Sequence, residues 1–312
     1  MDIVLLFPGQ GSQKSGMGKD LAAAFPAASA IFDEADTTLG FPLSRLCFEG
    51  PDDELMATRN AQPALLAHGA AVWATLADRL RPHVRAAAGH SLGEFTAYHA
   101  AGSFAFPDAL RLVRRRGELM FESGTKRPGA MAAILGLSEA NVEAACARAL
   151  EVGDVVPANY NTPEQLVISG EVEAVERAMA IAKELGAKRA IRLNVSGAFH
   201  SPLMDDAAQG LKVALDAAPI AATDFPVYSN VSAYPSAGSA DAKKLLLRQL
   251  TSPVRWTDLV RHIAEDVPDA VYVEMGPGAV LSTLVKRIVP GARTMTCGTA
   301  AEIDQLIGVL PS

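Results

Sequence analysis

Gly89-His90-Ser91-Leu92-Gly93 is the stretch that decides the fold of this 312-residue chain. An apolar run from Val84 to Ala88 precedes it and predicts a strand, and an Ala-rich helix is expected from Glu94 to Ala101. Glycines two positions before and after a serine permit a sharp strand-to-helix turn that presents the hydroxyl at the edge of a sheet. G-x-S-x-G also occurs in ordinary turns, but this context predicts a serine nucleophile, Ser91.

Composition narrows the class of protein. The chain is 49% hydrophobic and 20% charged, with a formal net charge of −7, which argues against nucleic acid as the main partner. The three cysteines, Cys47, Cys146 and Cys297, have no metal-ligand spacing and are expected to be buried thiols in a reducing compartment. No apolar run approaches the roughly 20 residues that span a bilayer, and no signal peptide is recognised. We expect a cytoplasmic protein without a metal and without membrane contact.

Strands alternate with helices along most of the chain, which predicts a parallel sheet covered on both faces. Residues 125–195 differ, because their pattern reads strand, helix, two paired strands, helix, strand, which is the ferredoxin-like βαββαβ order. We therefore expect an α/β fold in which residues 1–124 and 196–312 form a large domain and residues 125–195 an inserted small one. In this scheme, Ser138 is the N-cap of the first small-domain helix.

A nucleophilic serine needs a base, and the chain has six histidines. His200 differs from the others because it follows a strand predicted to end at Val195, and strand ends in a parallel sheet are where ligand-binding residues gather. His90 adjoins Ser91, and neighbours on a tight turn are expected to point apart. An isolated histidine is often structural, so position alone leaves both roles open for His200.

Arg116 lies on the apolar side of a predicted helix that Pro107 opens and that runs to about Glu122. At 100° per residue, Arg111, Arg114 and Arg115 share a polar stripe with two glutamates, whereas Arg116 falls between Leu112 and Met120. A buried guanidinium cannot lose its charge, so it requires acceptors. Two readings stay open, namely an internal Asp or Glu partner, or a bidentate clamp for a substrate carboxylate.

A glycine-rich segment, Phe7 to Gln13, follows the predicted strand Ile3 to Phe7. It lacks the Lys-Ser/Thr ending of a phosphate-binding P-loop and is not G-x-G-x-x-G. It is either a plain tight turn or a turn that presents backbone N–H groups.

Together, these segments resemble the malonyl-CoA:acyl carrier protein transacylases, a family related to the acyltransferase domains of polyketide synthases. The shared motifs run in family order over nearly the whole chain. They are FPGQGSQ at Phe7–Gln13, GHSLGE at Gly89–Glu94, RRRG at Arg114–Gly117, GAFHSPLM at Gly197–Met204, QLTSPVRW at Gln249–Trp256 and EMGPG at Glu274–Gly278.

The resemblance implies an α/β-hydrolase-like large domain with an inserted ferredoxin-like lobe and the active site between them. It assigns Ser91 as the acyl-accepting nucleophile, His200 as general acid and base, and Arg116 to the malonyl carboxylate. The backbone N–H groups of Gln10 and Leu92 would form the oxyanion hole.

Further residues take roles from the resemblance alone. The backbone carbonyl of Gln249 would orient the imidazole, in place of an acidic third member. Gln62 and Met120 are similar to pocket-lining positions, and Asn159 and Asn161 would lie near the cleft. The aromatic Phe199 is similar to malonyl-selective members, because a ring there would crowd an α-methyl group.

The activity that this resemblance implies is transfer of malonyl from malonyl-CoA to the phosphopantetheine thiol of acyl carrier protein, by ping-pong exchange and without a cofactor. We expect a monomer. Carrier proteins are acidic, so docking needs a local basic patch. The candidates are Lys126 with Arg127, Lys188 with Arg189, Lys286 with Arg287, and the stripe Arg111, Arg114 and Arg115.

Other functions stay open on the sequence. A trans-acting polyketide acyltransferase or an acyltransferase component of malonate decarboxylase would use the same chemistry with another carrier. A serine thioesterase or esterase would share Ser91 and His200, normally with an acid between them in the chain. A scaffold that kept the fold without activity is the remaining class, and the combination of Ser91, His200 and Arg116 argues against it.

Overall fold

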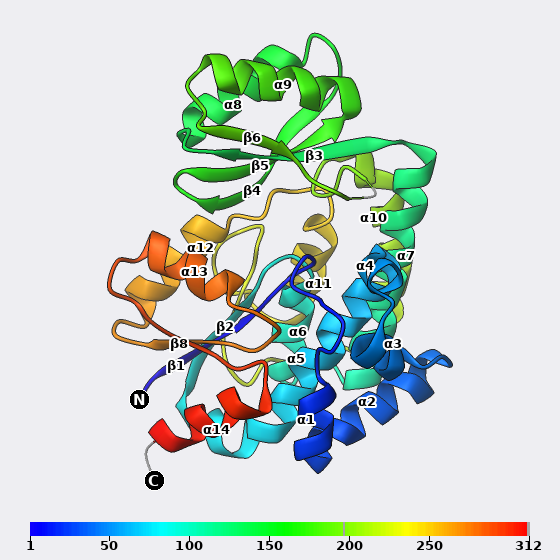
Figure 1. Cartoon of the computed structure of the whole chain (residues 1–312), viewed down its shortest axis with the longest axis vertical. Helices are drawn as coiled ribbons and strands as arrows, with labels where there is room; N and C mark the ends of the chain where they lie inside the picture. Colours follow the sequence, from blue (N-terminus) through cyan, green and yellow to red (C-terminus); the bar gives the residue numbers. More distant parts are fainter. Residues whose placement is uncertain (196, 311–312) are drawn as a thin grey trace.

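Two separate β-sheets organise the molecule, seen in a computed structural model that describes residues 1–195 and 197–310 (Figure 1). In the described residues the larger sheet has the strand order β7-β2-β1-β8-β9, and its strand pairs are all parallel. Its strands are β1 (Ile3–Phe7), β2 (Val84–Gly89), β7 (Val227–Tyr228), β8 (Val271–Glu274) and β9 (Arg293–Thr296). The predicted α/β fold class with a parallel sheet is therefore confirmed.

The large sheet is buried on both faces, as its apolar strands predict. Every residue of β1 is buried, and alternate side chains enter different cores: Ile3, Leu5 and Phe7 face one, Val4 and Leu6 the other. The second core is closed by α12 (Trp256–Asp266) and α13 (Val280–Ile288). The first lies under a larger group of helices. They are α1 (Lys19–Ala24), α2 (Pro26–Leu39), α3 (Leu43–Glu49), α4 (Asp52–Met56), α5 (Thr58–Leu80), α6 (Leu92–Ala100), α7 (Phe106–Lys126), α10 (Asp205–Ala217), α11 (Ser239–Arg248) and α14 (Ala300–Val309).

The smaller sheet is antiparallel and has the order β4-β5-β3-β6 in the described residues. Its elements run β3 (Gly129–Leu135), α8 (Glu139–Ala149), β4 (Val155–Thr162), β5 (Gln165–Glu171), α9 (Val172–Glu184) and β6 (Arg189–Arg192), which is the predicted βαββαβ order. Both helices cover one face of this sheet and share a core of their own with it. Figure 1 shows this unit above the large sheet, joined to it by the long helix α7.

Some predicted details differ from the structure. The strand expected to reach Val195 ends at Arg192, because β6 pairs with β3 only from Arg189 to Arg192. Ser138 occupies the N-cap position of α8, but its side chain makes no capping hydrogen bond. The predicted domain boundary at Ser196 lies outside the described residues, so the limits 1–124, 125–195 and 196–312 stay predictions.

Candidate active site

The serine turn links β2, which ends at Gly89, to α6, which begins at Leu92. Both flanking glycines are needed for close packing: a Cβ at Gly89 would lie 1.8 Å from the Gly93 carbonyl carbon, and one at Gly93 would lie 1.9 Å from the Phe7 carbonyl oxygen. Ser91 itself has φ 51° and ψ −106°. Such a backbone conformation costs a non-glycine residue about 1–3 kcal/mol. The turn is therefore strained at the residue that carries the hydroxyl.

His200 meets this hydroxyl directly. Its Nε2 lies 2.8 Å from Ser91 Oγ, and its Nδ1 lies 2.8 Å from the backbone carbonyl oxygen of Gln249. Since a carbonyl only accepts, Nδ1 carries the proton and Nε2 is free to accept one from the serine. Burial and the nearby Arg116 charge lower the pKa of His200 to about 3, so the imidazole is neutral at physiological pH.

His200 reaches the serine, but the prediction that it follows a strand of the parallel sheet is wrong. The strand before it, β6, belongs to the small antiparallel sheet and not to the parallel one. His200 lies beyond that strand, on the segment that returns to the large sheet, with φ 58°. The 3-10 turn η2 (Pro202–Met204) follows at once, and the Ser201 hydroxyl accepts a hydrogen bond from the Leu203 N–H.

Arg116 is buried on α7, with a side chain in contact with amides and the serine rather than an acid. Its Nη1 donates to Gln62 Oε1 at 2.9 Å, and its Nη2 donates to Gln249 Oε1 at 2.9 Å and to Ser91 Oγ at 3.1 Å. No ion pair involves Arg116 within residues 1–195 and 197–310, so of the two readings left open above, a direct Asp or Glu partner does not hold there. Burial lowers the pKa of Arg116 to about 10, which leaves it a cation at neutral pH.

A buried carboxyl, Glu94, reaches this cation through one amide. Gln249 Nε2 donates to Glu94 Oε2 at 2.6 Å and to the Ser91 carbonyl at 2.9 Å, while Gln249 Oε1 faces Arg116. An acceptor-only group at one end of the amide and a donor-only group at the other fix its orientation. Burial raises the pKa of Glu94 to about 7. Gln249 thus holds His200 with its main chain and Arg116 with its side chain.

Gln10 and Leu92 flank the serine on two turns. Gln10 lies in the glycine-rich segment after β1, and its Nε2 donates to Thr58 Oγ1 at 3.1 Å. Leu92 is the first residue of α6, where backbone N–H groups have no partner within the helix. A Cβ at Gly9 would lie 2.4 Å from the His90 carbonyl oxygen, so the two turns pack backbone to backbone. Both residues line the same pocket as Ser91.

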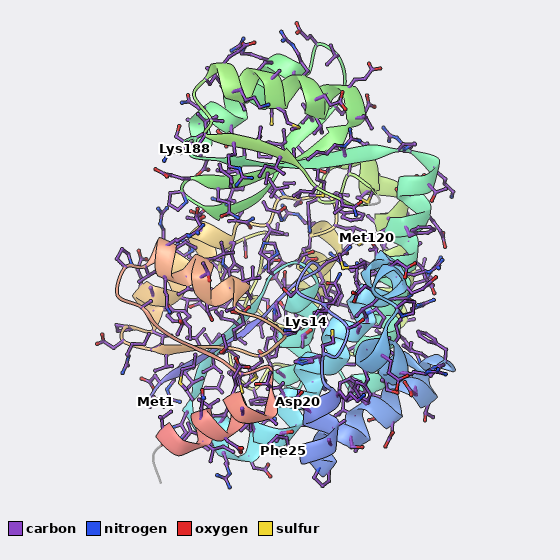
Figure 2. The ribbon with its side chains drawn as sticks, viewed as in Figure 1. Met1, Lys14, Asp20, Phe25, Met120 and Lys188 are labelled. Atoms are coloured by element: carbon purple, nitrogen blue, oxygen red, sulfur yellow. The ribbon has the colours of Figure 1, made fainter. Side chains whose placement is uncertain are left out.

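That pocket encloses about 230 Å³ between the two sheets. Figure 2 shows one of its residues, Met120 of α7, at the level between the small sheet and the helices of the large one. Gln62 Nε2 donates to the Met120 sulfur at 3.0 Å. All of the predicted site residues except Gln249 line this pocket. Those lining residues include Gln10, Gln62, Ser91, Leu92, Arg116, Met120, Asn159, Asn161, Phe199 and His200.

Sequence reasoning missed three residues of this site. His90 does not point away but lines the pocket, with its Nε2 2.8 Å from Asn161 Oδ1 and its ring tilted against Trp256. Glu94 and Asn230 lie behind the serine, fully buried. Glu94 belongs to the GHSLGE motif and lies on α6, a helix that is buried at almost every position. A carboxyl group in such an apolar helix is the sequence signal that could have marked it as a site residue.

The three cysteines lie in the interior of the molecule. Cys47, Cys146 and Cys297 are buried free thiols, and burial raises their pKa values to about 12. In the described part of the chain, no group of three or more His, Cys, Asp and Glu side chains is arranged to hold a metal ion. None of the described helices is both long enough and apolar enough to cross a membrane.

The pocket thus combines a serine activated by a histidine with a buried cation, on an α/β scaffold, which defines a serine acyltransferase or hydrolase. The family described as "Acyl transferase domain" matches residues 4–302, and the chain belongs to that family.

Its relatives carry more specific names. The chain is 48% identical to "Malonyl CoA-acyl carrier protein transacylase" of Bacillus subtilis, over 99% of this chain and 97% of the relative. It resembles the crystal structure of acyl-carrier-protein-S-malonyltransferase from Bartonella henselae with a TM-score of 0.95 and 42% identity, over 99% of both chains. A malonyl-transacylase solved in complex with a type II polyketide synthase acyl-carrier protein matches with a TM-score of 0.94 and 41% identity, again over 99% of both.

Proposed function

We propose that the protein transfers the malonyl group of malonyl-CoA to the phosphopantetheine thiol of acyl carrier protein, for fatty acid or polyketide synthesis. One observation carries the proposal: Ser91 Oγ lies 2.8 Å from a neutral imidazole and 3.1 Å from a buried guanidinium. A nucleophile beside a cation suits an acyl group with a carboxylate at its far end. The family and the names of the relatives support the same activity.

The first half-reaction loads the serine. The malonyl carboxylate binds Arg116, His200 Nε2 takes the proton of Ser91, and Ser91 Oγ bonds to the thioester carbon. The Gln10 and Leu92 N–H groups stabilise the resulting oxyanion. The C–S bond then breaks, and CoA leaves with the proton from His200, which gives a malonyl-serine ester and a neutral imidazole.

The second half-reaction reverses these steps with another thiol. His200 takes the proton of the phosphopantetheine thiol as its sulfur attacks the ester carbon. The bond to Ser91 Oγ breaks, and His200 returns the proton to the serine. Malonyl leaves as a thioester of the carrier protein, so the exchange is ping-pong and each step is balanced by residues of this chain.

Carrier-protein docking is best supported beside the pocket mouth. Arg287 Nη1 donates to Gln165 Oε1 at 3.1 Å, and Gln165 lines both the active-site pocket and a neighbouring hollow that contains Lys188 and Arg287. Figure 2 shows Lys188 beside the small sheet, directly before β6. Elsewhere, the predicted stripe is paired, since Arg111, Arg114 and Arg115 all contact carboxylates of their own helix. We infer that an acidic carrier protein meets Lys188 and Arg287 first.

Cytoplasmic location and a monomeric state complete the proposal. Three buried, unpaired cysteines are typical of a reducing compartment.

The loading step is tested by intact mass. Purified protein, mixed briefly with malonyl-CoA, should gain the mass of one malonyl group, and the Ser91→Ala variant should gain none. Release of free malonate with no acyl-enzyme, or loading of the Ser91→Ala variant, would overturn the proposal. Rapid hydrolysis in place of a lasting ester would favour a thioesterase.

A further inference from the structure

Asn230 lies just past the end of β7, the strand that pairs with β2 beside the serine turn. That parallel pairing joins Ala87 to Val227 and Ala88 to Tyr228. Beyond Tyr228, the side chain of Asn230, and not the backbone, makes the hydrogen bonds to the serine turn. Asn230 is fully buried. The reaction described above does not use it.

The side-chain amide of Asn230 bridges the two ends of the strained turn. Its Nδ2 donates to the Gly89 carbonyl oxygen at 2.7 Å, and its Oδ1 accepts from the Ser91 N–H, also at 2.7 Å. It therefore bonds two alternate residues of one chain, as the N–H and C=O of a single residue in a neighbouring parallel strand do. The amide continues the sheet ladder one step past β7 and encloses His90 and Ser91 in it.

Asn230 is itself held by its main chain. Its N–H donates to Glu94 Oε2 at 3.1 Å, and its carbonyl accepts from the Arg255 N–H at 2.9 Å. These bonds do not depend on the identity of the side chain, so a substitution at this position leaves them available. Gln249 Nε2 also donates to Asn230 Oδ1 at 3.4 Å. This second donor fixes which end of the Asn230 amide is the oxygen.

We propose that Asn230 is a positioning residue for the nucleophile: its amide holds Ser91 at φ 51°, with the hydroxyl directed at His200. It also occupies the Ser91 N–H, which leaves the oxyanion to Gln10 and Leu92. This inference rests on the proposed function for the roles of Ser91 and His200. Asn230 is not itself among the pocket-lining residues, and its side chain bonds the serine turn and not Arg116. It therefore acts on the reactivity of the serine and not on the choice of acyl group.

The test separates these two effects by using a sulfonyl fluoride, which needs no malonyl recognition. Ser91 Oγ bonds to sulfur, fluoride leaves, and the serine proton passes to His200. In Asn230→Ala we expect the rate of Ser91 sulfonylation, followed by mass, to fall about tenfold or more, because small misplacements of reacting groups are costly. We expect kcat for malonyl transfer to fall similarly, with KM and the preference for malonyl over acetyl unchanged.

Asn60→Ala is the matched control. Asn60 is also buried and bridges with its amide, donating to the Glu54 carbonyl at 2.8 Å and accepting from Arg114 at 2.8 Å, away from Ser91. We expect this variant to lose stability without slower sulfonylation. An unchanged sulfonylation rate in Asn230→Ala, or an equal loss in Asn60→Ala, would overturn the inference. Sulfonylation does not involve malonyl-CoA, so its result does not depend on whether malonyl-CoA is the substrate.

Asn230→Asp provides a rescue and a second variant if Asn230→Ala does not fold. A protonated carboxyl has the same shape, and it can donate to the Gly89 carbonyl while it accepts from the Ser91 N–H. We expect sulfonylation of Asn230→Asp at acid pH to approach the wild-type rate and to exceed that of Asn230→Ala. If Asn230→Asp reacts no faster than Asn230→Ala at any pH, the positioning role is contradicted. If Asn230→Ala does not fold, a sulfonylation rate of Asn230→Asp far below wild type at every pH contradicts it equally.

Discussion

Arg116 Nη2 lies 3.1 Å from Ser91 Oγ, so the buried cation touches the same oxygen that His200 is placed to deprotonate. The three groups come from α7, the serine turn and the segment after the small sheet. Their convergence places the binding of a carboxylate next to the site of acyl exchange.

Replacing Arg116 should therefore change the choice of acyl group. In Arg116→Ala we expect kcat/KM for malonyl-CoA to fall at least about a hundredfold, since a hydrogen bond to a charged group contributes roughly 1.5–3 kcal/mol and two nitrogens take part. Acetyl-CoA has no carboxylate to lose, so its kcat/KM should fall far less. Steady-state rates with both substrates check this.

Arg115→Ala is the control for that comparison. Arg115 is exposed on the same helix and pairs with Glu118 and Glu122. Its replacement should leave the ratio of malonyl to acetyl transfer unchanged. Equal losses for both substrates in Arg116→Ala would remove the clamp from the account.

The main chain and side chain of Gln249 have separable roles. Gln249→Met keeps the carbonyl that bonds His200 Nδ1 and removes the amide oxygen that bonds Arg116. We expect malonyl transfer to fall about tenfold, by loss of one charge-assisted hydrogen bond, and acetyl transfer to fall less. If kinetics with both acyl-CoAs show an equal decline, the amide does not act through Arg116.

The pH profile should follow the neutral state of His200. Burial first, then Arg116, lowers its pKa to about 3 from an ordinary 6.5, while the Gln249 and Ser252 carbonyls raise it and His90 lowers it. A base works only when unprotonated, so activity is lost as pH falls through this value and not near 6.5. The acid limb of the pH profile of kcat/KM for acetyl-CoA reports the pKa of His200 in the free enzyme.

Arg116→Ala should shift that acid limb. Removal of the cation takes away one of the causes that lower the pKa of His200, so the limb moves to higher pH. It stays below 6.5, because burial remains. An acid limb that is unchanged in Arg116→Ala, with Arg115→Ala as reference, would show that the two groups are not electrostatically coupled.

Phe199 lines the pocket beside His200. The ring is buried and lines the cavity together with Met120. In Phe199→Ala we expect kcat/KM for methylmalonyl-CoA relative to malonyl-CoA to rise about tenfold, since one methyl group in an apolar pocket is worth about 1–3 kcal/mol. Competition between the two substrates measures the ratio, and no rise would place the selectivity elsewhere.

Local pattern predicted the elements that carry this site, because each has its own periodicity. β1 was predicted at its observed bounds, and the inward position of Arg116 follows from helical geometry alone. The polar shell behind the serine was not predictable in this way. Glu94 and Gln249 stand in recognisable motifs, but the contacts that join them to each other and to Asn230 are tertiary, between α6, the end of β7 and the end of α11. Spacing along the chain does not predict those contacts.

His200 marks the limit of that reasoning. The residue was singled out for the end of a strand in the parallel sheet, and it lies instead on the return from an antiparallel one. Single-sequence patterns distinguish strands from helices, but they do not say which sheet a short strand joins.

The most direct measurement isolates malonyl-enzyme and follows its discharge by intact mass, with and without holo acyl carrier protein. We expect the thiol to remove malonyl from Ser91, and the carrier protein to gain it, much faster than water releases free malonate. Discharge at the same rate in both samples, with malonate as the product, would contradict a transfer function.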